Sequence, residues 1–425
     1  MKTDGKDTKQ GIIPALRFPE FHESKGWELK PLSDYLTEYR QKSDGKRKAH
    51  SVSLSKGIVN QIEYLGRSFS ADDTSHYKLM KPYDVVYTKS PTGNFPYGIV
   101  KQNLNPYNVI VSPLYGVFTP NNQYIGYIIH SIFESAIRLN NYLSTLVQKG
   151  AKNTIQIAND TFISKEILLP DNEDEQQKIA ACLSSIDALI KAAEHKIDEL
   201  KAHKKGLMQQ LFPADGKTVP QYRFPEFRDA GEWKSYAITN FFSRLTLRNN
   251  ENNDNILTIS AQYGLVSQKE YFNKLVAAEN ISNYFLLHKG DFAYNKSSSQ
   301  AYPQGAIKCL KLYDKGIVSP LYICLKIKNI NEVSFFEHFF EAGMINSEIK
   351  NIAQEGARNH GLLNVGVKDF FNQVSFTVPK HFEERKKIAD CLSSINDLIM
   401  AQTHRLAALK AHKKGLMQQL FPNIE

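Results

Sequence analysis

The chain has 425 residues, 42% of them hydrophobic and 23% charged, which is ordinary for a globular protein with two to four domains. No apolar run approaches the roughly 20 residues that cross a bilayer, and the polar first ten residues lack a signal-peptide core, so we expect a cytoplasmic protein. The net charge of +9 favours a polyanionic partner, because each phosphate that a cation neutralises releases counterions.

Two blocks of sequence occur twice. The segment Leu16-Arg-Phe-Pro-Glu-Phe21, followed by Trp27, returns as Tyr222-Arg-Phe-Pro-Glu-Phe227 with Trp233. The segment from Lys201 to Pro213 returns letter for letter at 410–422, a shift of 209 positions. Between these blocks the two halves differ widely. We therefore expect two variable modules on a duplicated frame, a design that suits a reader of two different targets at a fixed separation.

The blocks divide the chain into six expected segments. They are an N-terminal segment (1–27), a first module (28–170), a first spacer helix (171–213), a linker with the second opening block (214–233), a second module (234–379) and a second spacer helix (380–425).

Both modules have the composition of mixed α/β sequence. β-Branched and aromatic runs between turn residues predict strands, and apolar residues at helical spacing predict one amphipathic helix in each module. The predicted strands are 83–87, 109–111, 292–294 and 321–325, and the predicted helices are 125–146 and 334–353. Val111-Ser-Pro-Leu-Tyr115 returns as Val318-Ser-Pro-Leu-Tyr322. Such faint repeats indicate that the modules share one fold.

Apolar residues in the two spacer segments recur in steps of four and three, the pattern of a coiled coil. The expected seam positions are Ile179, Leu183, Ile186, Ile190, Ile197, Leu200, Ile388, Leu392, Ile395, Ile399, Leu406 and Leu409. Two helices of about 35 residues, which end at Pro213 and Pro422, are expected to pair antiparallel. An ordinary helical hairpin would tolerate more substitution than the two copies show, and the polar repeated tail suggests a surface offered twice to one partner.

Loops of both modules carry side chains that suit DNA. Arg and Lys pair with guanine edges, Asn and Gln pair with adenine, and Ser and Lys contact phosphate. The candidate DNA-binding residues are Arg47, Lys48, His50, Lys89, Ser90, Asn94, Tyr97, Lys149, Lys152 and Asn153 in the first module, and Arg248, Asn249, Gln262, Lys296, Ser297, Ser298, Gln300, Arg358, Asn359 and His360 in the second. A solvated loop is the simpler interpretation of any one of them, but the set occurs in both modules.

Sequence motifs give no catalytic centre. Asn94-Phe-Pro-Tyr97 is close to the Asn-Pro-Pro-Tyr signature of adenine methyltransferases, but no glycine-rich cofactor motif precedes it. Gly216-Lys-Thr218 lacks the first glycine of a phosphate-binding loop. The four cysteines form no Cys-x-x-Cys pair, so we expect reduced, mostly buried thiols, no disulfide framework and no metal site.

The whole pattern resembles the specificity subunit of type I restriction–modification enzymes. The resemblance rests on the two opening blocks, on Gly290-Asp-Phe-Ala-Tyr-Asn-Lys-Ser297, and on Lys-Ile-Ala-x-Cys-Leu-Ser-Ser-Ile with the Lys-Lys-Gly-Leu-Met-Gln-Gln-Leu-Phe-Pro ending. It covers nearly the full chain. Pro82-Tyr83 departs from it, because the second module has Lys289-Gly290 there, and this departure puts the local turn in question.

The resemblance implies an α+β fold class. Two mixed α/β target-recognition domains would be separated by two long helices that form an antiparallel coiled coil, with an internal pseudo-twofold repeat. Each domain would bind one half of a bipartite, asymmetric site in double-stranded DNA. The helices would set the spacing and dock two modification (methyltransferase) subunits, and restriction (translocase/endonuclease) subunits could join.

On this resemblance the chain is a non-catalytic adaptor that binds no cofactor itself, whereas its partners would use S-adenosylmethionine, ATP and Mg. Two other functions stay open. A two-headed protein-binding scaffold would show no salt-sensitive DNA binding, and a self-sufficient DNA-modifying enzyme would be active as the purified chain.

Overall fold

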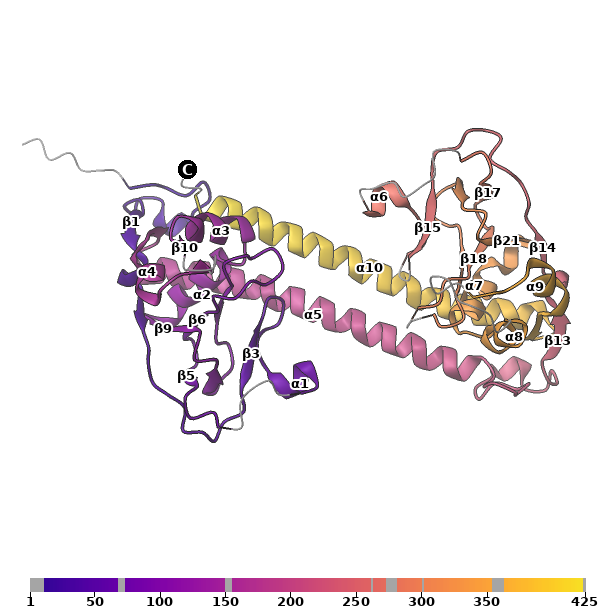
Figure 1. Cartoon of the computed structure of the whole chain (residues 1–425), viewed down its shortest axis with the longest axis horizontal. Coiled ribbons are helices and arrows are strands. Elements are labelled where there is room, and N and C mark those ends of the chain that lie inside the picture. Colours follow the sequence, from indigo (N-terminus) through magenta and orange to yellow (C-terminus); the bar gives the residue numbers. More distant parts are fainter. Residues whose placement is uncertain are drawn as a thin grey trace, which may run out of the picture. The chain divides into compact units, whose positions relative to one another are not determined.

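A computed structural model describes residues 11–67, 73–149, 155–260, 263–272, 281–299, 302–353 and 363–422 (Figure 1). The chain forms two compact units: Met1–Glu194 with Arg405–Glu425 make the first unit, and His195–His404 make the second. Each unit holds one module, the start of one long helix and the end of the other.

The first unit is built on a four-stranded antiparallel sheet in the order β2-β9-β6-β7, beside the strand pairs β1–β12, β3–β4, β5–β8 and β10–β11. Its strands are β1 (Glu28–Pro31), β2 (Leu36–Glu38), β3 (His50–Ser53), β4 (Gly57–Asn60), β5 (Lys78–Met80), β6 (Val85–Tyr87), β7 (Val100–Gln102), β8 (Val109–Val111), β9 (Gly116–Pro120), β10 (Gln148–Lys149), β11 (Ile155–Gln156) and β12 (Glu166–Leu169). Its helices are η1 (Pro19–Phe21), η2 (Leu32–Asp34), α1 (Gln61–Leu65), α2 (Gln123–Ile132), α3 (Ala136–Ser144), α4 (Asn159–Ser164) and the first part of α5 (Glu173–Leu211).

The second unit repeats this topology, with the sheet order β14-β21-β18-β19 and the pairs β13–β22, β15–β16 and β17–β20. Its strands are β13 (Lys234–Ala237), β14 (Phe242–Arg244), β15 (Leu257–Ser260), β16 (Gly264–Ser267), β17 (Phe285–His288), β18 (Phe292–Asn295), β19 (Ala306–Cys309), β20 (Lys315–Val318), β21 (Ile323–Ile327) and β22 (Ser375–Val378). Its helices are η4 (Pro225–Phe227), η5 (Ile238–Asn240), η6 (Ile330–Glu332), α6 (Gln268–Phe272), α7 (Val333–Glu341), α8 (Asn346–Ile352), α9 (Val367–Gln373) and the first part of α10 (Phe382–Leu420). The expected shared fold is therefore confirmed.

All four predicted strands occur, as β6, β8, β18 and β21, and the amphipathic stretch predicted in each module is helical, although it is broken once. Each stretch folds as two helices. Ser135 separates α2 from α3, because its side chain caps α3 by accepting the amide of Arg138. Gly343 separates α7 from α8 with a φ of 76°, a left-handed conformation that glycine adopts without strain.

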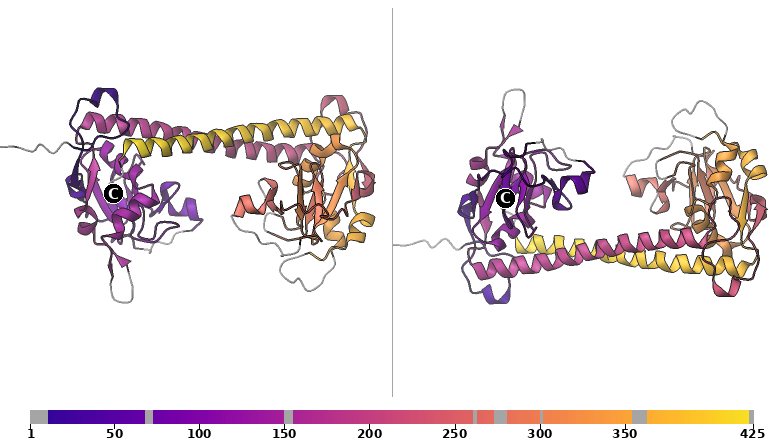
Figure 2. Two further views of the ribbon diagram at one scale, coloured as in Figure 1. Left: turned by 90° about the horizontal axis from the view of Figure 1, so that it is seen from above. Right: turned by 90° about the horizontal axis from the view of Figure 1, so that it is seen from below.

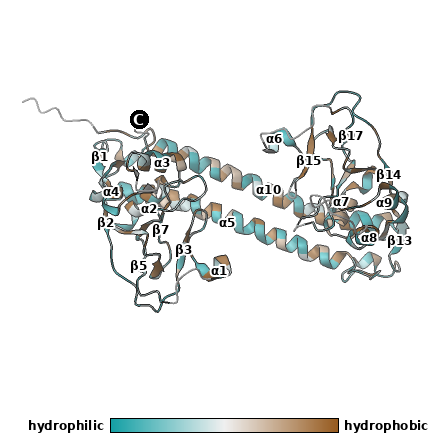
Figure 3. Ribbon diagram, viewed as in Figure 1, coloured by the Kyte–Doolittle hydropathy of each residue, from teal (hydrophilic) through white to brown (hydrophobic). Residues whose placement is uncertain are grey.

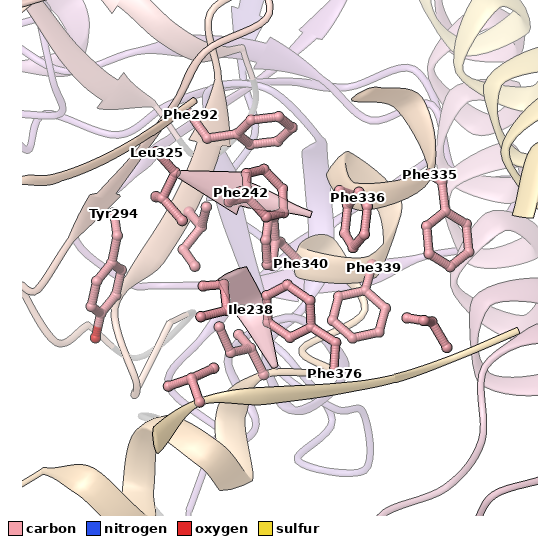
Figure 4. Close-up of a cluster of buried hydrophobic side chains, with 14 of the residues drawn as sticks. Ile238, Phe242, Phe292, Tyr294, Leu325, Phe335, Phe336, Phe339, Phe340 and Phe376 are labelled. Carbon is pink, nitrogen blue, oxygen red and sulfur yellow. The ribbon is translucent and has the colours of Figure 1, made fainter. Parts of the chain in front are cut away.

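The two cores fill the same topology with different side chains. In the second unit, Phe242 of β14 packs among Phe336 and Phe340 of α7 and Phe376 of β22 (Figure 4). In the first unit the corresponding helix α2 buries isoleucines, among them Ile125, instead. A module can therefore change its core residues without changing the strand order.

The turn before β6 and β18 is the same in both units despite the departure in sequence. Tyr83 has a φ of 68° and Gly290 a φ of 93°. In each turn the amide three residues before an aspartate donates to its side chain, at 2.7 Å for Asp84 and 2.8 Å for Asp291. Tyr83 thus adopts a backbone conformation that is uncommon for a residue other than glycine.

Helices α5 and α10 have 39 residues each, somewhat longer than expected, and each ends two residues before the predicted proline. Hydrophobic and hydrophilic residues alternate around both (Figure 3). Within the first unit, the end of α10 lies beside the start of α5 (Figure 2), and Leu183 shares a core with Leu420. Within the second unit, Leu211 shares a core with Leu392. The two helices are therefore antiparallel in each unit.

None of the twelve predicted seam residues is exposed. The buried ones are Ile179, Leu183, Ile186, Ile197, Ile388, Leu392 and Ile395, and the partly buried ones are Ile190, Leu200, Ile399, Leu406 and Leu409. Along the described residues, no helix combines the length and hydropathy that a membrane span requires.

The repeated opening block contacts both long helices in each unit. In the first unit Arg17 forms a bidentate pair with Glu175 of α5, at 2.7 and 2.8 Å, and both side chains are buried. The backbone amide of Leu16 donates to the carbonyl of Gln419 at 3.0 Å, near the end of α10. The ring of Trp27 packs against Phe421, with 6.0 Å between centroids.

The second copy of the block makes the same contacts in the second unit. Arg223 pairs with Glu384 of α10 at 2.7 and 2.8 Å, and the Trp233 ring lies 6.3 Å from Phe212 at the end of α5. Each block therefore joins the start of one helix to the end of the other. This double contact gives a structural reason why both blocks are repeated.

The repeated tail has one face turned inward, where each copy places a lysine, and one face exposed. Lys413 of α10 lies 2.6 Å from both Glu134 and Asp187, and the equivalent Lys204 of α5 is 6% exposed and lies 2.6 Å from Glu341. An apolar residue at these seam positions would remove the lysine partner of Asp187 and of Glu341 and one of the two lysine partners of Glu134. The rest of the tail is exposed at Lys201, His203, Lys205, Gln209 and Gln210 in the first copy.

Candidate nucleic-acid interface

Strand register brings the loops with the candidate residues to one end of each sheet. In the first unit Tyr87 of β6 pairs with Val100 of β7 and with Gly116 of β9, while Glu38 at the end of β2 pairs with Phe118 of β9. The loops 39–49 and 88–99 therefore leave the sheet at the same end, which we call the loop end. The second unit has an equivalent loop end, with loops 245–256 and 296–305.

Loop 88–99 holds Lys89, Ser90, Asn94 and Tyr97 on one hairpin. Lys89 is half-buried with a φ of 60°, and a Cβ at Gly98 would lie 2.6 Å from its amide nitrogen, so the loop closes tightly only with glycine there. Ser90 and Asn94 are exposed, and Tyr97 is partly buried with its carbonyl bound by the Tyr87 hydroxyl at 2.7 Å. The Asn94–Tyr97 segment is thus a turn at the tip of a hairpin.

Cations gather at this loop end. Burial and the charge of Lys78 lower the pKa of Lys89, and burial also lowers the pKa of Lys78, whose ammonium donates to the carbonyl of Tyr115 at 2.5 Å. Glu38, which pairs with Arg40 at 2.5 Å, is the carboxylate that acts on both lysines. An incoming phosphate would relieve the repulsion between the cations. Sequence motifs do not point to Arg40 and Lys78, because only the register of β2 and β5 brings them beside Lys89.

The candidates Arg47, Lys48 and His50 differ in exposure and in the groups that they contact. Arg47 pairs with Asp44 at 2.6 Å and Lys48 is exposed, so both remain near the surface. His50 is 7% exposed, and its Nδ1 lies 3.0 Å from the carbonyl of Lys48. Burial lowers the pKa of His50, which favours the neutral ring. His50 therefore stabilises its own loop and is not presented to a ligand.

In the second unit, Lys296, Ser297 and Ser298 lie on the hairpin that is equivalent to loop 88–99. Lys296 is partly buried, and the other two are exposed. The Ser298 hydroxyl donates to the carbonyl of Pro303 at 3.0 Å. Gly305, with a φ of 76°, closes this hairpin as Gly98 closes the first, since a Cβ there would lie 2.4 Å from the carbonyl oxygen of Asn295.

Arg248 and Asn249 follow β14. The exposed Arg248 lies over the ring of Phe285, with 4.2 Å from its guanidinium carbon to the ring centroid. Asn249 is 1% exposed, and its amide donates to the carbonyl of Asn253 at 2.9 Å and accepts from the Asn253 amide at 2.8 Å. Asn249 therefore has a structural role, and Arg248 remains available to a ligand.

The remaining candidates lie outside the described residues. They are Lys152, Asn153, Gln262, Gln300, Arg358, Asn359, His360 and the side chain of Lys149. Their role in binding stays a prediction.

The four cysteines are free thiols. Cys309 and Cys324 are buried, Cys182 and Cys391 are partly buried, and all four are free. Burial raises the pKa of the Cys324 thiol to about 12. Within the described ranges, no three His, Cys, Asp or Glu side chains come together as metal ligands.

Comparison with protein families identifies the first module. Residues 40–202 match the family described as "Type I restriction modification DNA specificity domain". This segment is therefore similar to type I restriction–modification DNA specificity domains. The matched segment includes most of the loop end of the first unit and residues 173–202 of α5. The second unit repeats the topology of the specificity domain.

A solved structure with a TM-score above 0.5 shows the same fold over nearly the whole chain. The S subunit of a type I restriction–modification system from M. genitalium has a TM-score of 0.57 and 14% identity, with 97% of this chain and 100% of that chain covered. The HsdS subunit from Thermoanaerobacter tengcongensis has a TM-score of 0.37 and 13% identity, with 93% and 96% covered. A search of curated proteins finds no match.

Proposed function

We propose that this chain is the DNA-binding specificity subunit of a type I restriction–modification complex and that each unit reads one half of a bipartite, asymmetric target. One observation carries the proposal: two units of one topology present different side chains at equivalent loop ends. The hairpins begin alike, with Lys89-Ser90 and Lys296-Ser297, but the neighbouring positions carry Arg40 and Lys78 in the first unit and Thr246 and Phe285 in the second. Different donors at equivalent positions favour two different half-sites.

The long helices would set the distance between the half-sites and dock two modification subunits. The exposed face of the repeated tail, with Lys201, His203 and Lys205 in one copy, supports this role, because two equal surfaces suit two copies of one partner. In this proposal the chain is non-catalytic and binds no cofactor. S-adenosylmethionine would serve the modification subunits, and ATP and Mg any restriction subunits. We expect the complex in the cytoplasm, with the DNA.

The test is a genome-wide map of methylated adenines from cells that carry the wild-type gene or loop variants. Lys89→Ala with Asn94→Ala should relax or change one half of the mapped motif, and Lys296→Ala with Ser297→Ala the other half. Lys350→Ala, on the exposed face of α8, is the control and should leave the motif intact.

Three outcomes would end the proposal. A motif that changes in both halves with either loop variant is incompatible with one unit per half-site. If the purified chain methylates or cuts DNA without a partner, it is the self-sufficient enzyme. If its affinity for DNA does not depend on salt concentration, it is the protein scaffold.

A further inference from the structure

A hollow of about 390 Å³ opens on the second unit beside the edge strand β14. It is bounded by the edge strand β14, by the residue that follows β21 and by α9. Phe242, Val367 and Phe371 supply its apolar lining, and Arg244, Lys328 and Lys368 supply cations. The other lining residues are Thr239, Ser243 and Asn372. Three cations from three separate elements therefore meet at one hollow whose described lining contains no carboxylate.

The three cations are available to a ligand. Arg244, Lys328 and Lys368 are all exposed, and none of them forms a salt bridge within the described part of the chain. The Lys328 ammonium donates to the carbonyl of Thr239 at 2.5 Å, which fixes its position and leaves two protons free. By contrast, Lys315 of the same unit is paired with Glu251 at 2.8 Å.

The first unit has the opposite charge at the equivalent place. Strand register makes Glu38 of β2 the counterpart of Arg244 of β14. Phe162 stacks on Tyr87 as Phe370 stacks on Tyr294, which aligns α4 with α9. Asp160 of α4 is then the counterpart of Lys368, and Asn121 the counterpart of Lys328.

The equivalent place in the first unit is also occupied by its own side chains. Asn159 of α4 donates to Glu38 at 2.8 Å, and Arg40 pairs with the same carboxylate. The pKa of Glu38 is lowered, because these hydrogen bonds outweigh the effect of burial. The two units therefore share the fold here, but only the second one presents an unpaired basic hollow among the described residues.

We propose that this hollow is a binding site for the sugar–phosphate backbone of DNA, used by the second unit alone. The inference rests on the proposed function. Arg and Lys with Ser, Thr and Asn are the donors that bind phosphate and sugar in protein–DNA contacts, and Phe371 with Val367 can meet the apolar face of a deoxyribose. Arg244 also stands where β14 reaches the loop end, so the hollow continues the proposed interface.

The test measures binding of the full chain, alone and with its partner subunits, to two labelled duplexes over a range of salt concentrations. One duplex has a random sequence and the other carries the motif mapped from wild-type methylation. The variant is Arg244→Gln with Lys328→Gln and Lys368→Gln. Its slope of log affinity against log salt should be less negative by about 0.9 for each lost phosphate contact, or roughly 2 to 3 for the three. The sequence preference of the second half-site should stay the same, because backbone contacts carry no base information.

Two further variants distinguish a specific phosphate site from a general loss of positive charge. Arg244→Glu with Lys368→Asp brings in the residue types of the first unit, which that fold tolerates, and should weaken binding more than the neutral triple. The matched control, Arg228→Gln with Lys350→Gln and Lys386→Gln, removes three exposed charges elsewhere on the second unit and should change the slope less.

The outcomes separate this inference from the proposed function. If the hollow triple and the control triple give the same slope, the phosphate site is wrong although specific binding stands. If the hollow triple keeps the wild-type slope but loses a partner subunit, the occupant is an acidic protein surface and the DNA assignment is overturned. If wild-type chain shows no preference for the mapped motif, the proposed function itself fails.

Discussion

At the scale of single residues, a polar side chain in a loop can serve the loop itself or a ligand. Asn249 and His50 both serve the loop: each is buried and bonded to the backbone nearby. Ser90 and Asn94 are exposed at a hairpin tip. The four residues have similar settings in the sequence, but only the exposed pair is free to contact DNA.

Replacing Asn249 tests this distinction. Asn249→Ala removes the hydrogen bonds to Asn253 and should lower the free energy of unfolding by about 1 to 3 kcal/mol, measured by urea denaturation. The mapped second half-site should not change. Asn250→Ala, at an exposed neighbour, is the control and should lie within about 0.5 kcal/mol of wild type. A changed half-site with unchanged stability would assign Asn249 to DNA contact.

The sequence could identify the loops but not the role of each side chain. Residue type and loop position pointed to His50 and Asn249 as strongly as to Lys89. Asn side chains often bond the backbone a few residues away, and the sequence does not reveal which ones do so. Arg40 and Lys78 were missed for the converse reason, since they reach the site only through strand pairing.

At the scale of elements, the end of each long helix is joined to the opposite module by one lysine. Lys413 meets Glu134 and Asp187, whereas Lys204 meets Glu341 alone. Position 396, which corresponds to Asp187 in the repeat, is Asn396. A polar residue in an apolar seam favours one register over others, because a shifted register leaves its charge unpaired.

Lys413→Met tests the contact of Lys413 with Glu134 and Asp187 in the first unit. The substitution leaves Asp187 without its lysine and leaves Glu134 with Lys101 alone, and their partial burial places the cost between that of surface and fully buried pairs, at about 2 kcal/mol. Urea denaturation would measure it. The neighbouring Lys414→Met, at an exposed position, should have little effect. Equal stability of the two variants would show that Lys413 contributes only packing.

Sequence periodicity predicted the seam and both helix ends within a few residues, because these depend on local spacing and on proline. It did not predict the breaks at Ser135 and Gly343. The apolar spacing continues across both breaks, so periodicity alone reads each pair of helices as one. The cap and the left-handed glycine that end the helices are single-residue features.

At the scale of the whole molecule, a glutamate with a lowered pKa stabilises each unit, Glu134 in the first and Glu341 in the second. Burial raises the pKa of Glu341, but hydrogen bonds from His338 and Lys204 outweigh it and lower the value to about 2. Glu134 is shifted in the same direction, because His130, Lys101 and Lys413 outweigh burial. A carboxyl group whose pKa is depressed by folding stabilises the fold above its unfolded pKa and loses that contribution as the pH falls through the folded value.

Acid should therefore destabilise both units together. We expect the midpoint of thermal unfolding to fall as the pH drops from about 4.5 towards 2. Glu341→Gln should start from a lower midpoint at pH 7 and decline less steeply, as differential scanning calorimetry would record. Equal slopes for variant and wild type would show that Glu341 titrates alike in the folded and unfolded chain.

The duplication in the sequence predicted the repeated topology of the two units, because core spacing and turns recur in both. It did not predict the opposite charges at Arg244 and Glu38. These positions carry no shared motif, and only the paired strands reveal that they correspond.

The contacts of Lys204 and Lys413 with the two modules also define which modules are interchangeable. The frame always offers a lysine, so an inserted module has to bring the matching acid. Both modules do so one helical turn after a buried histidine, as His130 with Glu134 and His338 with Glu341. A protein engineer could therefore screen donor modules for a histidine near the end of this helix, followed by a glutamate three or four residues later, before any chimaera is made.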